Sequence, residues 1–65
     1  MKSKLTLRET EVLKLIAEGY DHREIANKLN VSITTVASHK RNLMPKLKAR
    51  NSAHAVMLGI QRKVI

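Results

Sequence analysis

Residues 21–47 of this chain, DHREIANKLNVSITTVASHKRNLMPKL, decide its fold. The stretch opens with Asp21 and Glu24, whose spacing is that of a capping box at the start of a helix. The apolar stripe that follows is formed by Ile25, Ala26 and Leu29. Asn30 then closes the pattern, because Asn tolerates the left-handed conformation in which many helices end. The sequence therefore predicts a short helix over residues 22–29.

A second, longer helix begins after only a short turn. Ser32 is a good N-cap, and the side chains that share one side of the following helix are Val36, Lys40, Leu43 and Leu47. We place this helix over residues 33–46. Val31 lies between two polar turn residues as an apolar plug. A brief helix joined by such a turn to a longer basic helix is typical of a helix-turn-helix.

One further helix is predicted on each side of this pair. Thr6 and Glu9 form another capping-box pair, Gly19 is a natural stop, and the apolar residues between are Val12, Leu13, Ile16 and Ala17. Asn51 or Ser52 starts a last helix, whose apolar face contains Ala53, Val56, Met57 and Ile60. No segment alternates with period two. We predict an all-α four-helix bundle with helices over residues 7–18, 22–29, 33–46 and 52–62.

The charges are strongly segregated along the chain. The net charge is +8, yet every acidic residue lies in the first 24 positions, namely Glu9, Glu11, Glu18, Asp21 and Glu24. A field of one sign concentrated in this way attracts a polyanion, and duplex nucleic acid is the densest one in a cell. A solubilising basic tail is the alternative, but these cations lie within a helical pattern rather than a low-complexity run.

Size and composition exclude several other classes. The chain has 65 residues and no Cys, so it is a single domain without disulfides or a cysteine zinc site. Tyr20, the one aromatic residue, offers no platform for stacking single-stranded bases. His22, His39 and His54 lack metal-ligand spacing, and without a nucleophile–base pair or a glycine loop we expect neither an enzyme nor a cofactor. No apolar run has the length of a membrane span, so we expect a soluble, cytoplasmic protein.

These features belong to a longer set of residues in a fixed order. In the first helix and its stop the set comprises Leu5, Thr6, Arg8, Glu9, Glu11, Val12, Leu13, Leu15, Ala17 and Gly19. Beyond them it comprises Glu24, Ile25, Ala26, Leu29, Val31, Ser32, Thr35, Val36, His39, Asn42, Leu43, Lys46, Leu47, Asn51 and Ala55. The set resembles the LuxR/FixJ-type (GerE-like) helix-turn-helix output domain of bacterial transcription regulators. This resemblance implies a DNA-binding domain over residues 5–65, preceded by a tail or linker over residues 1–4.

Three positions depart from that family's pattern. The family usually has Lys in place of Ala37 and Arg or a similar polar residue in place of Ser52, and it rarely has Pro at the position of Pro45. Ala37 removes one contact to DNA that relatives commonly make. Pro45 lacks a backbone donor and clashes with the carbonyl of Arg41, so we expect the third helix to bend or end around residues 43–46.

A helix-turn-helix places its second helix in the major groove, with the N-terminal half against the base edges. The side of this helix opposite its apolar stripe carries the expected base contacts, which are Thr34, Ala37, Ser38 and Arg41. Pro45 shares that side. Arg41 is the expected principal reader, because its guanidinium can bond guanine O6 and N7 together. A solvated surface position without a DNA contact is the alternative for Arg41, Thr34 and Ser38.

Phosphate contacts are expected from groups flanking that side, namely Arg23, Lys28, Ser32, Thr35, His39, Lys40 and Lys46. By the resemblance, His39 lies where the recognition helix meets the rest of the fold, so packing is an alternative role for it. Glu9 and Glu11 are expected to face away from DNA. We expect one of them to form a surface pair with Lys46 or Arg8, worth little to stability.

The last helix raises the question of a dimer. In relatives this helix commonly pairs with its twin, which makes Val56, Met57 and Ile60 the expected dimer interface. Completion of the monomer's own core is the alternative, and Gly59 is predicted to permit close helix approach. The expected partners are double-stranded DNA, a second copy of the chain and RNA polymerase, with no membrane.

The leading function is therefore sequence-specific DNA binding by a bacterial transcription regulator. A sigma-factor C-terminal domain shares the helix-turn-helix and a similar opening, but His39 and the ending from Asn42 to Leu47 favour the LuxR/FixJ type. A protein-interaction module on a degenerate helix-turn-helix is the alternative from a different class. Its best support comes from the departures at Ala37, Pro45 and Ser52.

Overall fold

The computed structural model describes residues 4–65. Within this range four helices follow one another, α1 (Leu7–Ala17), α2 (His22–Leu29), α3 (Ile33–Leu47) and α4 (Ser52–Gln61), and no strand is present. Every helix bound lies within one residue of its expected position, which confirms the all-α class. Of the tail expected over residues 1–4, only Lys4 falls within the described residues.

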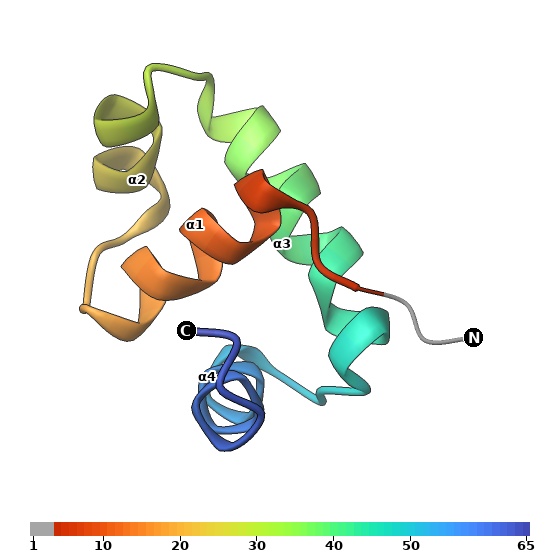
Figure 1. The fold of residues 1–65 in the computed structure, drawn as a ribbon. Helices are drawn as coiled ribbons and strands as arrows, with labels where there is room; N and C mark the ends of the chain where they lie inside the picture. The colour runs from red at the N-terminus through yellow and green to blue at the C-terminus, as the bar shows by residue number, and fades with distance from the viewer. Residues whose placement is uncertain (1–3) are drawn as a thin grey trace.

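Helix α1 lies at the centre of the bundle and contacts the other three helices (Figure 1). In that view α2 and α4 lie on either side of α1, and α3 runs along the edge of the molecule. Helix α3 also contacts all three of its neighbours. These contacts fix one side of α3 to the bundle, and its opposite side faces away from the other helices. Within the described residues no helix is long and apolar enough to cross a membrane.

Side-chain caps start each of the four helices. Thr6 with Glu9 and Asp21 with Glu24 both form complete capping boxes, in which each side chain bonds the other residue's backbone amide at 2.9–3.1 Å. Ser32 accepts from the amide of Thr35 at 3.0 Å to start α3. At α4 the cap is Asn51 rather than Ser52, since the Asn51 side chain accepts from the amide of His54 at 2.9 Å. The sequence signals for helix starts are thus confirmed, because these bonds satisfy donors that have no partner inside the helix.

The ends of the helices are also determined by residues at the ends themselves. Gly19 has φ +98° after α1, and Asn30 has φ +58° after α2, as expected for residues that tolerate the left-handed region. Lys48 ends α3 with φ +58°. A lysine in that conformation costs about 1 kcal/mol, so packing around the end of α3 must offset it.

Pro45 does not end α3 where the sequence suggested. The helix continues through it and ends at Leu47, one residue beyond the expected range of 43–46. Pro45 sits in the last turn, so it removes only the bond that its own amide would have made to the carbonyl of Arg41. In the turn that closes α3, the amide of Lys48 donates to the carbonyl of Pro45 and the amide of Ala49 donates to the carbonyl of Met44.

The buried core is aliphatic and includes residues from all four helices, with Ala55 contributed by α4. Its largest fully buried side chains are Val12 and Leu13 from α1, Ile25 from α2, and Val36 and Leu43 from α3. Lys40, which shares the predicted stripe of α3, lies half-buried at its edge. Each fully buried aliphatic side chain contributes about 1.5–3 kcal/mol, so this stripe sets which side of α3 faces inward.

Helix α4 turns its small residues inward. Ala55 and Gly59 are buried, and a Cβ on Gly59 would lie 2.8 Å from Leu13 Cδ2. The absence of a side chain at Gly59 therefore allows α4 to approach α1 closely, as predicted. After α4 the chain folds back, with the amide of Val64 donating to the carbonyl of Gly59 at 2.8 Å, and Ile65 packs against the core.

Candidate nucleic-acid interface

The outward side of α3 carries the residues expected to contact bases. Its inward side is held by Val36, Leu43 and Leu47, all buried. On the opposite side, Thr34 and Arg41 are exposed, while the smaller Ala37 and Ser38 are half-buried. Because α3 is a continuous helix, these residues fall on one face, at spacings of three and four. We call the set Thr34, Ala37, Ser38 and Arg41 the reading face.

Asn42 was missed by the sequence reasoning and borders this reading face. It is exposed and lies four residues after Ser38, so the two share a strip of the helix. The same spacing rule that selected Ser38 was enough to find it. Its side-chain amide can both donate and accept, which is the pattern that an adenine edge presents in the major groove.

The start of α3 is arranged to receive an anion. The Ser32 hydroxyl lies 2.8 Å from the Thr35 hydroxyl and accepts from the Thr35 amide. The amides of Ile33 and Thr34 lie in the first helical turn, where no preceding helical carbonyl is available to them. Free amides and the positive end of the helix dipole favour a phosphate at this point.

Three of the expected phosphate-binding cations lie on α2 and α3. Arg23 and Lys28 of α2 are exposed, and Lys40 of α3 is half-buried. Lys28 Nζ lies 4.4 Å from the centroid of the Tyr20 ring, so a cation–π contact holds its stem along the surface. All three retain a charge that no carboxylate within residues 4–65 neutralises by an ion pair.

Lys46, also expected at a phosphate, has a carboxylate partner. Its Nζ donates to Glu9 Oε1 at 2.8 Å, joining the end of α3 to the start of α1. Glu9 is only 4% exposed, so the expectation of a surface pair was wrong for this residue. The packing of α3 across the first turn of α1 removes Glu9 from water, which the capping-box spacing alone does not reveal.

The carboxyl group of Glu9 stays ionised at this buried position. Burial raises its pKa, but the hydrogen bond from Lys46, the bonds from Thr6 and the charge of Lys46 outweigh that effect. The net result is a pKa below the ordinary value of 4.5. Glu9 therefore acts as a charged anchor for both Lys46 and the α1 cap. Glu11 instead pairs with Arg8 at 3.1 Å on the exposed side of α1, where such a pair contributes little.

The three histidines lie on three different helices. His39 is half-buried on α3, and His22 is half-buried in the first turn of α2. His54 Nδ1 accepts from the amide of Arg50 at 3.0 Å and so helps to shape the turn before α4. Within residues 4–65 no group of three His, Cys, Asp or Glu side chains is placed to hold a metal ion.

Of the residues expected at a dimer interface, Met57 and Ile60 lie on the outer side of α4, whereas Val56 packs against the core. Met57 is 47% exposed and Ile60 is 59% exposed, while Val56 is half-buried. The inner side of the helix is formed by Ala55 and Gly59. Met57 and Ile60 therefore do not complete the monomer's core, and they leave apolar surface in water.

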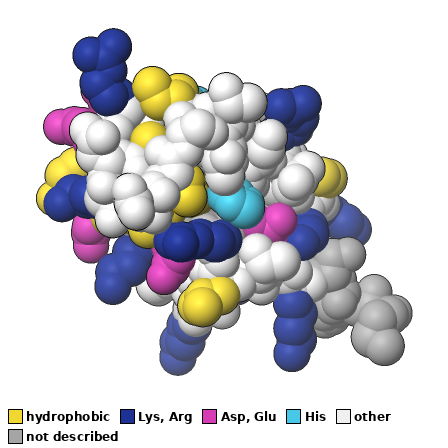
Figure 2. Space-filling view, turned by 90° about the horizontal axis from the view of Figure 1, so that it is seen from above, with side chains coloured by type: hydrophobic (Ala, Val, Ile, Leu, Met, Phe, Trp, Pro, Cys, Tyr) yellow, Lys and Arg dark blue, Asp and Glu magenta, His cyan; other side chains and the backbone are white. Residues whose placement is uncertain are grey.

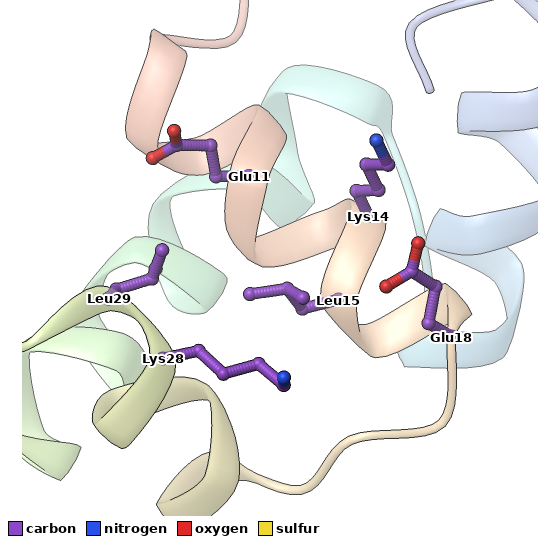
Figure 3. A pocket seen from close by; sticks show the side chains of 6 residues that line it. All are labelled: Glu11, Lys14, Leu15, Glu18, Lys28 and Leu29. Carbon is purple, nitrogen blue, oxygen red and sulfur yellow. The ribbon is translucent and has the colours of Figure 1, made fainter.

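Two surface hollows have different electrostatic character. The first, of about 270 Å³, lies between α1 and α2, and Figure 3 shows Lys28 reaching across it below Leu15, with Glu11, Lys14 and Glu18 around it. Its charges are mixed, so it offers no preference for a polyanion. The second, of about 530 Å³, lies near the ends of α3 and α4, and its charged lining residues are Lys4, Lys46, Arg62 and Lys63.

Positive side chains are distributed around the reading end of the molecule. Figure 2 views this end from above, where the turn between α2 and α3 lies in Figure 1. Lys and Arg side chains project mostly around the outline of the face, while hydrophobic side chains and a histidine appear among the uncharged polar side chains and backbone of its middle. Asp and Glu side chains lie beside cations both at the edge and nearer the middle, close to a histidine. The cations at the outline are separate from one another, which suits contacts to individual phosphates.

Comparisons with known proteins agree with this arrangement. Residues 3–58 match the family model GerE, described as bacterial regulatory proteins, luxR family. The chain is 43% identical over 61 residues to the oxygen regulatory protein NreC of Staphylococcus carnosus (strain TM300), covering 94% of this chain and 28% of that protein. NreC of Staphylococcus aureus (strain JH9) gives the same identity and coverage.

A solved structure shares the whole fold. The response regulator ChrA of a heme-sensing two-component system superposes with a TM-score of 0.93 and 31% sequence identity, covering 100% of this chain and 32% of that one. The chain thus spans less than a third of the length of these relatives. The match covers the capped helices, the turn and the reading face together, and we conclude that this chain belongs to the luxR family of bacterial regulatory proteins.

Proposed function

We propose that this chain is a domain of a bacterial transcription regulator and binds double-stranded DNA sequence-specifically, with α3 in the major groove. The observation that carries the proposal is the reading face, which lies outward on α3 opposite a fully buried stripe. Its residues include the exposed Arg41 and two small hydroxyl side chains, Thr34 and Ser38. We assign residues 5–65 to this domain and residues 1–4 to a tail or linker.

The residues of the reading face present different chemical groups to the bases. Arg41 donates two hydrogen bonds to guanine O6 and N7, a pair worth about 1–3 kcal/mol of discrimination. Thr34 and Ser38 bond base edges or nearby phosphates through their hydroxyls. Ala37 replaces a lysine that relatives commonly carry, so at this position the chain makes an apolar contact rather than an ionic one.

Phosphate contacts fix the domain on the duplex. The groups assigned to them are Arg23, Lys28, Ser32, Thr35, His39, Lys40 and Lys46. Lys46 contributes less than the others, because Glu9 already offsets its charge. With about six phosphates neutralised, log affinity falls with log salt concentration at a slope of about −5.

The outer side of α4 supports assembly as a dimer on DNA. Met57 and Ile60, with half-buried Val56 beside them, place apolar surface where two copies can meet about a twofold axis. Two domains joined in this way present their α3 helices to half-sites about one helical turn apart. A regulator of this kind also contacts RNA polymerase, and it acts in the cytoplasm, where both DNA and polymerase are available.

Selection of bound duplexes from a random pool, followed by anisotropy titration of the selected site, tests the proposal. We expect a recurrent motif with two related half-sites, bound more tightly than random DNA. Arg8→Ala is the matched control for Arg41→Ala, because it removes the same charge from the exposed side of α1. Absence of any complex at low salt would favour the protein-interaction module instead.

A further inference from the structure

Ile33 is an apolar side chain that the fold does not use. It is 47% exposed, and among the large hydrophobic residues exposed in the described part of the chain it is the one that lies on α3. It belongs neither to the buried core nor to the half-buried side chains packed against it. Val31 and Val36, on either side of it in sequence, pack against or within that core. Folding therefore does not explain an isoleucine at this position.

Its place on α3 brings Ile33 next to the reading face. Ile33 is the first residue of the helix, and Ala37 and Arg41 follow at steps of four. Residues at such steps form a continuous row along one side of a helix. From the first to the last of these positions the row extends about 12 Å, at about 1.5 Å of rise per residue. That length corresponds to three or four base pairs at about 3.4 Å each.

The two ends of this row differ in chemistry. Arg41 ends it with a planar donor suited to guanine, whereas Ile33 and Ala37 present only methyl and methylene groups. Neither of these two side chains can bond a phosphate or a polar base edge. In the major groove the apolar group available to them is the C5-methyl of thymine.

We propose that Ile33, supported by Ala37, contacts a thymine C5-methyl group two to four base pairs from the guanine bound by Arg41. Ile33 is thus a specificity-determining residue that adds a thymine requirement to each half-site. This inference rests on the proposed DNA-binding function and deepens it. The contact covers apolar surface that is otherwise left in water at the start of α3.

Replacing thymine by uracil removes only the methyl group and leaves base pairing and hydrogen-bonding groups intact. Each thymine of the selected duplex is replaced in turn by uracil, and affinity is measured for the unaltered protein and for Ile33→Ala. We expect the unaltered protein to lose about fourfold in affinity at one thymine per half-site, the value for one buried methyl or methylene group. Ile33→Ala should bind thymine and uracil versions of that site equally.

Leu7→Ala is the matched control, since Leu7 is 77% exposed on α1, outside the reading face. This variant should retain the full preference for thymine over uracil. The proposal is overturned if the unaltered protein binds every uracil duplex as tightly as the thymine duplex, or if Ile33→Ala keeps the preference. Failure of the DNA-binding function itself would be seen earlier and separately, as the absence of any selected duplex.

Discussion

The two halves of α3 have different surroundings. The N-terminal half, residues 33–41, buries Val36 but otherwise carries the reading face and a hydroxyl-capped start, and none of its side chains forms an ion pair with another described residue. The C-terminal half, residues 42–47, contains buried Leu43 and Leu47 and is tied to α1 by the 2.8 Å contact between Lys46 and Glu9. We call residues 33–41 the free half of α3 and residues 42–47 its anchored half.

The anchored half should account for most of the stability of α3. Leu43 is fully buried, so Leu43→Ala should lower the free energy of unfolding by about 2–5 kcal/mol. Ile33→Ala, an equally large truncation in the free half, should change it by less than about 0.5 kcal/mol. Urea unfolding followed by circular dichroism compares the two variants directly. Similar losses would mean that both ends of α3 are packed alike.

Breaking the ion pair between Lys46 of α3 and Glu9 of α1 should have the next largest effect on the free energy of unfolding. Lys46→Ala leaves the nearly buried carboxylate of Glu9 without its cation, so we expect a loss of about 2–3 kcal/mol in unfolding free energy. Arg8→Ala breaks the exposed pair with Glu11 and should cost less than about 0.5 kcal/mol. Adding Glu9→Gln to the Lys46 change should restore part of the loss. Equal costs for the two single variants would show that Glu9 is not an anchor.

Apart from buried Val36, the side chains of the free half should affect binding rather than folding. Arg41→Ala should lower affinity for the selected duplex by about 1–3 kcal/mol and relax preference at one base pair, because the bonds to guanine are lost. Unfolding of this variant should match the unaltered protein, since Arg41 is exposed. Lys46→Ala, measured where it is fully folded, should weaken all sequences alike. Parallel losses on selected and random duplexes for both variants would contradict this division.

Lowering the pH should reduce the stability that Glu9 gives to the anchored half of α3. The folded pKa of Glu9 lies below its value in the unfolded chain, so ionised Glu9 stabilises the fold above about pH 4.5 and this contribution disappears as pH falls through the folded pKa. Thermal unfolding between pH 6 and pH 3 should show a shallower loss for Glu9→Gln than for Glu11→Gln, which removes an exposed carboxyl group. Identical pH profiles would argue against a depressed pKa at Glu9.

Helix boundaries were readable from the sequence because their causes are local. Each N-cap and its partner lie three residues apart, and Gly19 and Asn30 mark stops through their own backbone preferences. The inward stripe of α3 was also evident, since apolar residues recur there with helical period. The reading face followed from that stripe as its opposite side.

Features that depend on packing between distant segments were harder to predict from the sequence. The burial of Glu9 requires Lys46, which is 37 residues away, to lie across the start of α1. In α4 apolar residues occur on all sides, so periodicity does not show that Ala55 and Gly59 face inward and Ile60 outward. That choice depends on the close approach of α4 to Leu13, which only Gly59 allows.

An NMR titration of the labelled chain with its selected duplex tests most directly whether the free half of α3 reads the bases. The largest changes in amide shifts should occur from Ser32 to Arg41, with smaller ones at the cations of α2. Amides around the buried side chains of α1, such as Val12 and Leu13, should change little. Changes confined to α1 or α4, with residues 33–41 unaffected, would contradict the account.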